Sequence, residues 1–300
     1  MAIVEVNELK KSYGKQEALK GLSFFASEGE IYGIIGPDGA GKTTLFRILT
    51  TLLLADSGEA KVNGLDVKKD FRLLRKQIGY MPGKFSLYQD LTVEENLQFF
   101  ASIFKTTIQA NYYLIEDIYK QIEPFKNRKA GKLSGGMKQK LALSCALIHK
   151  PTVLFLDEPT TGVDPVSRQE FWQMLKKLKT QGITIIVSTP YMDEASMCDT
   201  IAFIHNGKFL KKDTPQKMIE SYSEILWVVK TDKMHTLLYD LRDFHLVKTA
   251  FSFGEMYHIT MQEDAKKEDL QSYLQKKGHS NIDIQIINAS IEDCFMSLID

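Results

Sequence analysis

Two short stretches of the sequence hold residues whose types and spacing could do phosphate chemistry. The first, GPDGAGKTT at residues 36–44, fits the pattern of a glycine, four residues and then Gly-Lys-Ser/Thr. Its glycines can take backbone angles closed to other residues, so successive N–H groups can converge on an anion. Lys42 would add a full positive charge, and the Thr43 hydroxyl is placed to bind Mg²⁺. The stretch predicts a nucleoside triphosphate site rather than a glycine-rich turn entering an ordinary helix.

The second stretch is an apolar run that ends in two carboxylates, Asp157 and Glu158. The run begins at Thr152 and has the pattern of a fully buried parallel strand, and ligands of open α/β sheets bind at the carboxyl ends of such strands. We therefore expect both carboxylates to meet the phosphates. The alternative is a charged exit from a strand into a loop.

The elements around these stretches have the order of an α/β core. Residues 31–35 read as a buried strand that leads into the glycine-rich stretch, and residues 44–49 start a helical pattern after it. A helix over 166–180 and a third buried strand over 182–189 follow the two carboxylates. A short helix then starts at 193–197, and an edge hairpin turns at 205–208.

Other strands and helices are expected on either side of this core. Residues 2–9, 24–26 and 59–62 read as strands, with turns at Ser57-Gly58 and Asn63-Gly64. A capping box at Thr92–Glu95 then opens a helical insertion. Its further helices are expected over 112–122 and 136–149, with a solvated basic turn at 126–129 between them.

The last part of the chain, from residue 216, has a different pattern. Its expected order is strand, helix, strand, strand, helix and strand, which is that of the split βαβ, ferredoxin-like unit. A final amphipathic turn is expected over 290–298. The expected strands are 224–230, 244–249, 256–261 and 282–287, and the expected helices are 234–241 and 263–277.

Composition excludes several classes of function. The formal net charge is +0, from 38 basic and 38 acidic residues, so no global field favours nucleic acid or an anionic membrane surface. No apolar run approaches the roughly 18–20 residues that span a bilayer, and the N-terminus lacks a signal-peptide pattern, so we expect a partner to provide any membrane role. Cys145, Cys198 and Cys294 lack metal-ligand spacing, which indicates buried thiols in a reducing compartment.

Together with LSGGMKQ at 133–139 and LFLDEPTTGVD at 154–164, the glycine-rich motif resembles the ATPase subunits of ATP-binding cassette (ABC) transporters. LSGGMKQ is the discriminating motif, because other phosphate-loop enzymes lack it. The likeness covers about residues 2–213, and its wording resembles ABC-2-type exporter ATPases. It implies an α/β phosphate-loop ABC ATPase core with a mixed sheet, an antiparallel β subdomain and a helical insertion over about 90–150. The nucleotide-binding domain would span 1–215, and a small α+β (ferredoxin-like) accessory or dimerisation domain would span 216–300.

The resemblance assigns roles to individual residues. Glu158 matches the general base that polarises the attacking water, and Asp157 matches the carboxylate that holds Mg²⁺ together with Thr43. Tyr13 could on its own be a packing residue or a stacking one, and it matches the adenine-stacking aromatic of the family. The ATP-binding residues it implies are Tyr13, Gly36, Pro37, Asp38, Gly39, Ala40, Gly41, Lys42, Thr43 and Thr44.

The resemblance also implies partners. The signature residues Ser134, Gly135, Gly136 and Met137 would contact the ATP held by a second, facing ATPase subunit, and Asp164 would link the two sites. ATP would close this homodimer or heterodimer, and its hydrolysis would reopen it. An integral membrane permease would follow that cycle, docking near an exposed aromatic cluster of Phe85, Leu87 and Tyr88 that could alternatively be a local satellite core. The location implied is cytoplasmic, on the inner face of the cell membrane, and no motif indicates the transported molecule.

Three residues depart from the family pattern. Gly83 stands where a glutamine usually contacts Mg²⁺ and water, and Gln89 could replace it only if the loop folded back. Pro190 stands where a histidine usually contacts the γ-phosphate, and proline offers neither donor nor imidazole. Asp38 replaces a more common asparagine and adds negative charge near phosphate. Gly83 and Pro190 predict slow hydrolysis and leave open a regulatory subunit with little turnover, whereas Asp38 could be a turn residue or could tune the affinity for ATP. A soluble, non-transport ABC ATPase is the other alternative.

Overall fold

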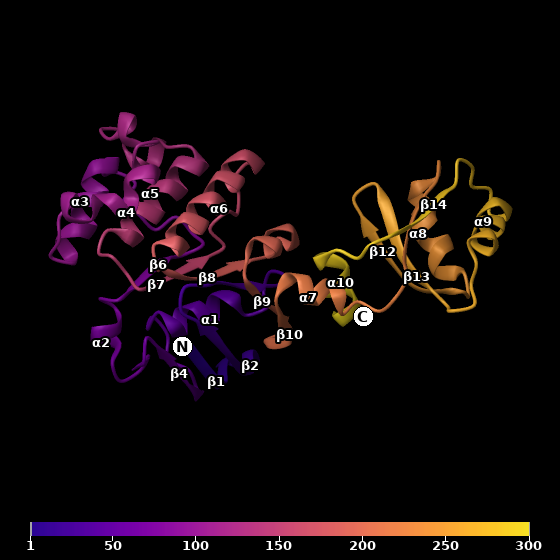
Figure 1. Cartoon of the computed structure of the whole chain (residues 1–300), viewed down its shortest axis with the longest axis horizontal. Helices are drawn as coiled ribbons and strands as arrows, with labels where there is room; N and C mark the ends of the chain where they lie inside the picture. Colours follow the sequence, from indigo (N-terminus) through magenta and orange to yellow (C-terminus); the bar gives the residue numbers. More distant parts are fainter. Residues whose placement is uncertain (1, 300) are drawn as a thin grey trace. The chain divides into compact units, whose positions relative to one another are not determined.

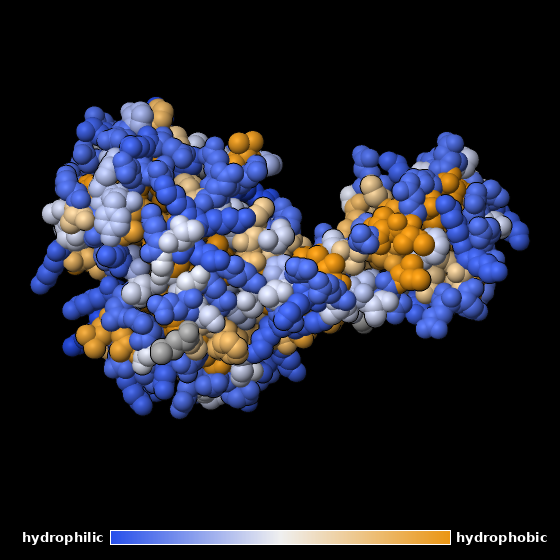
Figure 2. Space-filling model, in the orientation of Figure 1, coloured by the Kyte–Doolittle hydropathy of each residue, from blue (hydrophilic) through white to orange (hydrophobic). Residues whose placement is uncertain are grey.

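The computed structural model describes residues 2–299, and positions 1 and 300 of the expected domain ranges lie outside it. The chain forms two compact units, of which the first runs to Gln216 and the second begins at Lys217 (Figure 1). No helix within residues 2–299 is both long and apolar enough to cross a bilayer. The visible face of the first unit is mainly hydrophilic (Figure 2).

A six-stranded sheet forms the centre of the first unit, with the order β10-β9-β3-β8-β7-β6. All neighbouring pairs are parallel except β9 with β10. Every residue of β3, β7 and β8 is buried, which explains why these strands are continuous apolar runs. The strands are β3 (Ile31–Ile35), β6 (Ile78–Met81), β7 (Val153–Asp157), β8 (Thr184–Thr189), β9 (Thr200–His205) and β10 (Lys208–Asp213).

Helices cover both faces of this sheet (Figure 1). The helices α1 (Lys42–Leu49) and α6 (Pro165–Thr180) lie on opposite faces, and the short α2 (Phe71–Leu74) precedes β6. The ring of Phe46 on α1 meets that of Phe155 on β7 edge to face, with 5.9 Å between the centroids. This contact packs the helix that follows the glycine-rich stretch against the strand that ends in Asp157.

A second, antiparallel sheet has the order β2-β1-β4-β5. Its strands are β1 (Ala2–Tyr13), β2 (Gln16–Ser27), β4 (Ser57–Val62) and β5 (Leu65–Asp66). The first strand continues past the expected end at Leu9, because a bulge at Glu8, whose φ is 47°, keeps β1 paired with β2 beyond it. The turn expected at Ser57-Gly58 is wrong: Gly58 lies in β4 with φ 85°, and a Cβ there would be 2.3 Å from the Glu8 carbonyl oxygen.

The helical insertion contains α3 (Val93–Ile103), α4 (Tyr112–Tyr119) and α5 (Gly135–Leu147). The capping box that opens α3 is confirmed, since the Thr92 side chain accepts from Glu95 N and Glu95 accepts from Thr92 N. The second helix ends at Tyr119, before the expected residue 122. Pro124 explains this, because it lacks the N–H that would extend the helix.

The second unit has the order β11, α8, β12, β13, α9, β14, and its antiparallel sheet is ordered β12-β13-β11-β14. This is the ferredoxin-like arrangement that the element pattern predicted. The third element, the strand expected over 244–249, is shifted to Val247–Phe253, because Phe244 caps α8 and the turn at Gly254, with φ 57°, pairs Phe253 with Met256. The elements are β11 (Leu226–Lys230), α8 (Met234–Asp243), β12 (Val247–Phe253), β13 (Met256–Met261), α9 (Lys267–Lys276) and β14 (Asp283–Ile287), with α7 (Pro215–Glu220) before and α10 (Ile291–Ile299) after them.

Candidate nucleotide-binding site

The glycine-rich stretch joins β3 to the N-terminus of α1, as the sequence predicts. Gly39 and Gly41 have φ values of 78° and 109°, in the region that favours glycine. Gly36 is required for a different reason, because a Cβ there would lie 2.1 Å from the Ile204 carbonyl oxygen. The loop therefore has the backbone that a phosphate-binding turn requires, and it ends at the start of α1, where the helix dipole favours an anion.

Lys42 is held inside this loop and is only 3% exposed. Its ammonium group donates to the carbonyl oxygens of Gly36, at 2.8 Å, and Pro37, at 2.9 Å. Its Nζ also lies 3.0 Å from Glu158 Oε1, whereas Asp38 Oδ1 is 3.9 Å away on a side chain that is 89% exposed. Of these two carboxylates, Glu158 is therefore the close counter-ion of Lys42.

Asp157 and Glu158 leave the sheet at the end of β7, beside β8. Asp157 Oδ1 accepts a hydrogen bond of 2.7 Å from the Ser188 hydroxyl, and Thr43 also hydrogen-bonds to this carboxylate. Burial raises the pKa of Asp157, and these two hydrogen bonds oppose the increase. Glu158 has φ 51° and donates its N–H to Ser188, which holds its backbone at the turn.

A cleft of about 320 Å³ opens around these groups. It brings Tyr13 and Glu158, which are 145 positions apart in the chain, to the same space as the loop residues. Tyr13 is 48% exposed there, so its ring is available to a ligand. The full lining is Tyr13, Gln16, Ala18, Gly39, Gly41, Lys42, Thr43, Thr44 and Glu158. Sequence reasoning missed Gln16 and Ala18, whose alternation on β2 was the available signal.

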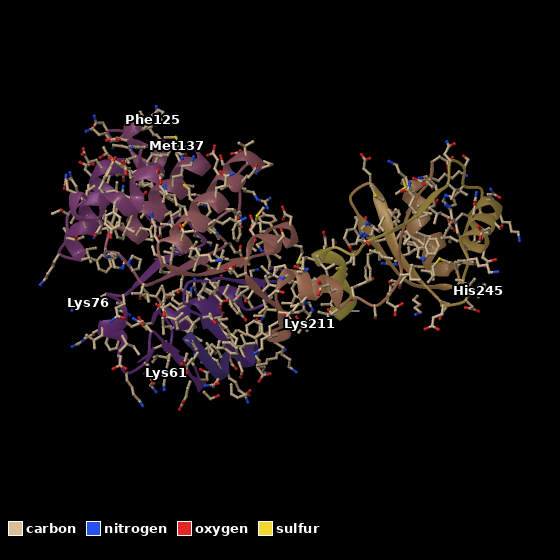
Figure 3. All side chains as sticks on the ribbon, in the orientation of Figure 1. Lys61, Lys76, Phe125, Met137, Lys211 and His245 are labelled. Atoms are coloured by element: carbon tan, nitrogen blue, oxygen red, sulfur yellow. The ribbon has the colours of Figure 1, made fainter. Side chains whose placement is uncertain are left out.

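The signature residues form the N-terminus of α5, and Met137 is labelled there in Figure 3. Ser134 caps the helix by accepting from Met137 N at 3.4 Å. A Cβ on Gly136 would lie 2.9 Å from the Ser167 hydroxyl. Asp164 caps α6 through Ser167 N, so both predicted interface segments lie next to each other. All four signature residues lie in the part of the chain that the structure describes, and none of them lines the cleft around Lys42.

Two of the three departures from the family pattern, Gly83 and Pro190, lie at strand ends near the carboxylates. Gly83 follows β6, and a Cβ there would be 3.0 Å from the Asp157 carbonyl oxygen and 3.8 Å from Glu158 Cβ. Gln89 does not fold back toward this point, because its carbonyl accepts from Gly131 N, at 2.9 Å, in the helical insertion. Pro190 directly follows the last residue of β8.

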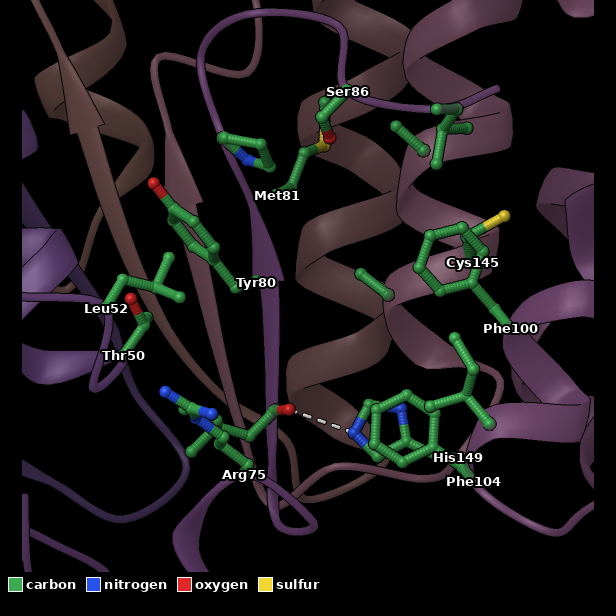
Figure 4. A pocket seen from close by; sticks show the side chains of 16 residues that line it. Thr50, Leu52, Arg75, Tyr80, Met81, Ser86, Phe100, Phe104, Cys145 and His149 are labelled. Atoms are coloured by element: carbon green, nitrogen blue, oxygen red, sulfur yellow. Dashed lines mark hydrogen bonds between the residues drawn. The ribbon is translucent and has the colours of Figure 1, made fainter. Parts of the chain in front are cut away.

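The exposed cluster expected at 85–88 is only partly exposed. Tyr88 is 51% exposed, but Leu87 is buried and Phe85 is half-buried, so the expectation is wrong for Leu87. The buried side chain of Leu87 lines a second cavity, of about 390 Å³, between β6 and the helices α3 and α5 (Figure 4). The cavity is largely apolar, and His149 stacks on Phe104 in its wall with 3.7 Å between the ring centroids.

His149 is the titratable imidazole of that wall. Its Nε2 lies 2.9 Å from the Ile78 carbonyl oxygen, the contact drawn in Figure 4. Burial lowers the pKa of His149, and the hydrogen bond to Ile78 acts in the opposite direction. The three thiols are buried as expected, and burial raises the pKa of Cys145, which also faces this cavity.

Comparison with known proteins gives relatives along the whole chain. Residues 19–161 match the family model described as ABC transporter. The chain is 36% identical over 304 residues to the "Probable multidrug ABC transporter ATP-binding protein YbhF" of Escherichia coli (strain K12), covering 99% of this chain and 52% of that protein. It thus spans about half the length of that relative. It is 38% identical over 224 residues to a "Nod factor export ATP-binding protein I" of Burkholderia lata, covering 74% of each chain.

Solved structures agree with these sequence relatives. CbiO1 of Clostridium perfringens, part of the ABC transporter complex cbiONQ, superposes with a TM-score of 0.65 at 29% identity, covering 73% of this chain and 91% of that chain. The ATP-binding cassette MJ0796, as a dimer in a post-hydrolysis state bound to ADP and Pi, superposes with a TM-score of 0.63 at 28% identity, covering 70% of this chain and 98% of that chain.

Proposed function

This chain belongs to the ABC transporter ATP-binding proteins, and we propose that it binds and hydrolyses ATP to power a membrane exporter. The observation that carries the proposal is the cleft in which Tyr13, Lys42 and Glu158 meet. It offers an aromatic face, a buried cation and a carboxylate to one ligand, which are the groups that a base, a triphosphate and a hydrolytic water require.

In this proposal, Tyr13 stacks on the adenine and the amides of residues 39–44 bind the β-phosphate. The ammonium group of Lys42 leaves Glu158 and binds the β- and γ-phosphates, because its flexible side chain allows it to change partner. The remaining loop residues, Gly36, Pro37 and Asp38, shape the turn that presents these amides.

The residues present fit Mg²⁺. Thr43 and Asp157 already hydrogen-bond to each other, so both oxygens face the same point beside the phosphate loop. Hard oxygen donors suit this ion, which is usually held by one or two protein groups together with phosphates. Bound there, the ion would neutralise charge on the β- and γ-oxygens.

Glu158 is the proposed general base. Its backbone is fixed by two contacts to Ser188, while its carboxylate is 21% exposed at the cleft. Once the phosphates take Lys42, this carboxylate is free to accept a proton from the attacking water. Gly83 and Pro190 provide no side-chain donor to that water or to the γ-phosphate. Since each such contact is worth a few kcal/mol in the transition state, we expect slow but real turnover.

Two partners complete the proposal. The signature residues Ser134, Gly135, Gly136 and Met137 stand apart from the cleft of their own chain, so they would serve the ATP of a facing ATPase subunit, with Asp164 at the contact between the sites. The permease would insert an apolar element into the cavity lined by Leu87, and Phe85 and Tyr88 would lie at its rim. The protein would then work on the cytoplasmic face of the cell membrane.

Phosphate release by the parent protein and by Glu158→Gln tests the catalytic proposal. We expect at least about a hundredfold loss, because the base contributes about that factor. Glu170→Gln makes the same charge change on a surface pair with Lys140 and should leave the rate unchanged. Equal rates for Glu158→Gln and the parent would exclude Glu158 as the base. No hydrolysis by the parent with its membrane partner would favour the second candidate, a nucleotide-binding regulatory subunit, which Gly83 and Pro190 motivate.

A further inference from the structure

A buried carboxylate outside the cleft connects two of its loops. Glu194 lies in the 3₁₀ helix Met192–Met197 after β8 and is 3% exposed. Its Oε1 accepts from the Thr160 hydroxyl at 2.7 Å and from Arg168 Nε at 3.1 Å, and its Oε2 accepts from the Thr189 hydroxyl at 2.6 Å. Both oxygens are therefore engaged, which fixes the carboxylate in one geometry.

The two hydroxyl donors belong to different segments, which follow or end the neighbouring strands β7 and β8. Thr160 lies in the loop that runs from Glu158 to Asp164. Thr189 is the last residue of β8, directly before Pro190, and its carbonyl oxygen accepts from Gly36 N at 3.2 Å. One carboxylate thus joins the strand end at the phosphate loop to the loop that carries the proposed base.

Arg168 ties the same carboxylate to α6. Its guanidinium also pairs with Asp193 at 3.1 Å and lies over the Tyr191 ring, 4.2 Å from the centroid. The helix it stands on is capped by Asp164. If the carboxylate lost one of these partners, it would remain buried with an unsatisfied oxygen, which is energetically costly. This cost favours joint movement of the two loops and the end of the helix.

We propose that Glu194 is a positioning residue that couples the end of β8 to the loop from Glu158 to Asp164. A shift at the phosphate end of β8 then reaches Asp164, which faces the second subunit in the proposed dimer. The proposal rests on the proposed function only for that last step. It matters in this chain because Pro190 has no donor of its own to sense the γ-phosphate.

Coupling of this kind is reciprocal, and hydrogen exchange of the nucleotide-free protein measures it directly. Thr189→Val should raise amide exchange in residues 160–164 about two- to tenfold, and Thr160→Val should do the same in residues 189–193. Thr184→Val is the matched control: Thr184 is equally buried at the other end of β8, where it accepts from Gly29 N. If each variant changes exchange only around its own position, the coupling does not exist.

A conservative substitution provides the second measurement. In Glu194→Gln, the amide oxygen can keep Thr160 and Arg168 while the amide nitrogen replaces the acceptor of Thr189. This variant should therefore match Thr189→Val, and combining the two should add less than about twofold to the exchange of residues 160–164. Additive effects would overturn the proposal.

Measurements of ATP turnover distinguish a positioning role of Glu194 from a general effect on stability. Glu194→Gln and Thr189→Val should lower kcat and bring the Hill coefficient for ATP toward 1, with ADP affinity within about twofold of the parent. Lower ADP affinity with an unchanged Hill coefficient would mean a local structural role and refute the coupling. A parent protein that hydrolyses no ATP would contradict the proposed function, while the exchange measurements would still decide the coupling.

Discussion

The ion pair between Lys42 and Glu158 predicts that removing the proposed base tightens the binding of ADP. An anion must take Lys42 away from Glu158 Oε1, 3.0 Å distant, while the hydrogen bonds to Gly36 and Pro37 remain available. Glu158→Gln removes the charge and keeps the shape, so phosphate no longer competes with a carboxylate for the same ammonium group.

The size of the effect follows from the geometry. Two unit charges 3.0 Å apart attract by about 5 kcal/mol at an effective dielectric constant of about 20. Desolvation of the buried ammonium and the 21% exposure of Glu158 offset most of this. A net value of about 1.4 kcal/mol corresponds to about tenfold in Kd. We therefore expect Glu158→Gln to bind ADP about tenfold more tightly than the parent.

Isothermal titration calorimetry with ADP in EDTA measures this without metal and without the dimer that ATP is proposed to form. Asp38→Asn is the matched control, because it removes one negative charge at 3.9 Å from Lys42 on an 89% exposed side chain. It should change the Kd by less than about twofold, since exposed charges contribute little. An equal tightening in both variants would show a long-range charge effect, and no tightening in Glu158→Gln would refute the ion-pair argument.

Four further measurements follow from the same geometry. Tyr13→Ala should weaken ATP binding by about 1–2 kcal/mol, whereas Tyr13→Phe should keep the ATP affinity of the parent, because the half-exposed ring offers its face rather than its hydroxyl. Equal losses of affinity in the two variants would exclude stacking. Asp157→Asn should abolish Mg²⁺-dependent turnover. It should also raise the Tm of the nucleotide-free protein by about 2–4 °C, because a carboxyl group whose pKa is raised by burial destabilises the fold when it is charged. A lower Tm would contradict this reasoning. The pKa of His149 is lowered, so the unfolded chain binds its proton more readily, and stability should fall as the pH drops below about 6.5. His149→Gln should flatten that decline in urea unfolding, and an unchanged pH dependence would assign it elsewhere. Gly83→Gln should raise kcat several-fold relative to Gly83→Ala, because the Cβ of the new side chain would lie 3.8 Å from Glu158 Cβ and its amide would extend from there; equal rates would show that the amide does not reach the water.

The elements with strong local signals could be predicted from the sequence. The buried runs of β3, β7 and β8 and the capping box at Thr92 each depend on residues next to one another in the chain. Gly58 was misread as a turn because its left-handed backbone is needed by a contact with Glu8, far away in sequence. The residues next to Gly58 in the chain give no indication of this contact, so the local sequence could not predict it.

The site divides in the same way. The glycine loop, Lys42 and the two carboxylates are motif residues, and the structure brings them together. The sequence places Leu87 on the surface because its neighbours are aromatic and polar. In the structure, it is buried in the wall of the cavity beside β6. Glu194 gave no signal, since a glutamate in an acidic turn is usually solvated and only the fold supplies its partners.

Two of the positions that depart from the family pattern, Gly83 and Pro190, lie where the backbone is already closely held. A side chain at Gly83 would start 3.0 Å from the Asp157 carbonyl oxygen, so a larger residue there requires β6 or β7 to shift by a few tenths of an ångström. Pro190 follows Thr189, whose carbonyl oxygen binds Gly36 N and whose hydroxyl binds Glu194. A proline at that point restricts the backbone after a residue that is fixed on both sides. Since neither position supplies a polar side chain, we expect the proposed hydrolysis to depend on how Glu158 and the loop after it are held, and Ser188 and Glu194 hydrogen-bond to these segments.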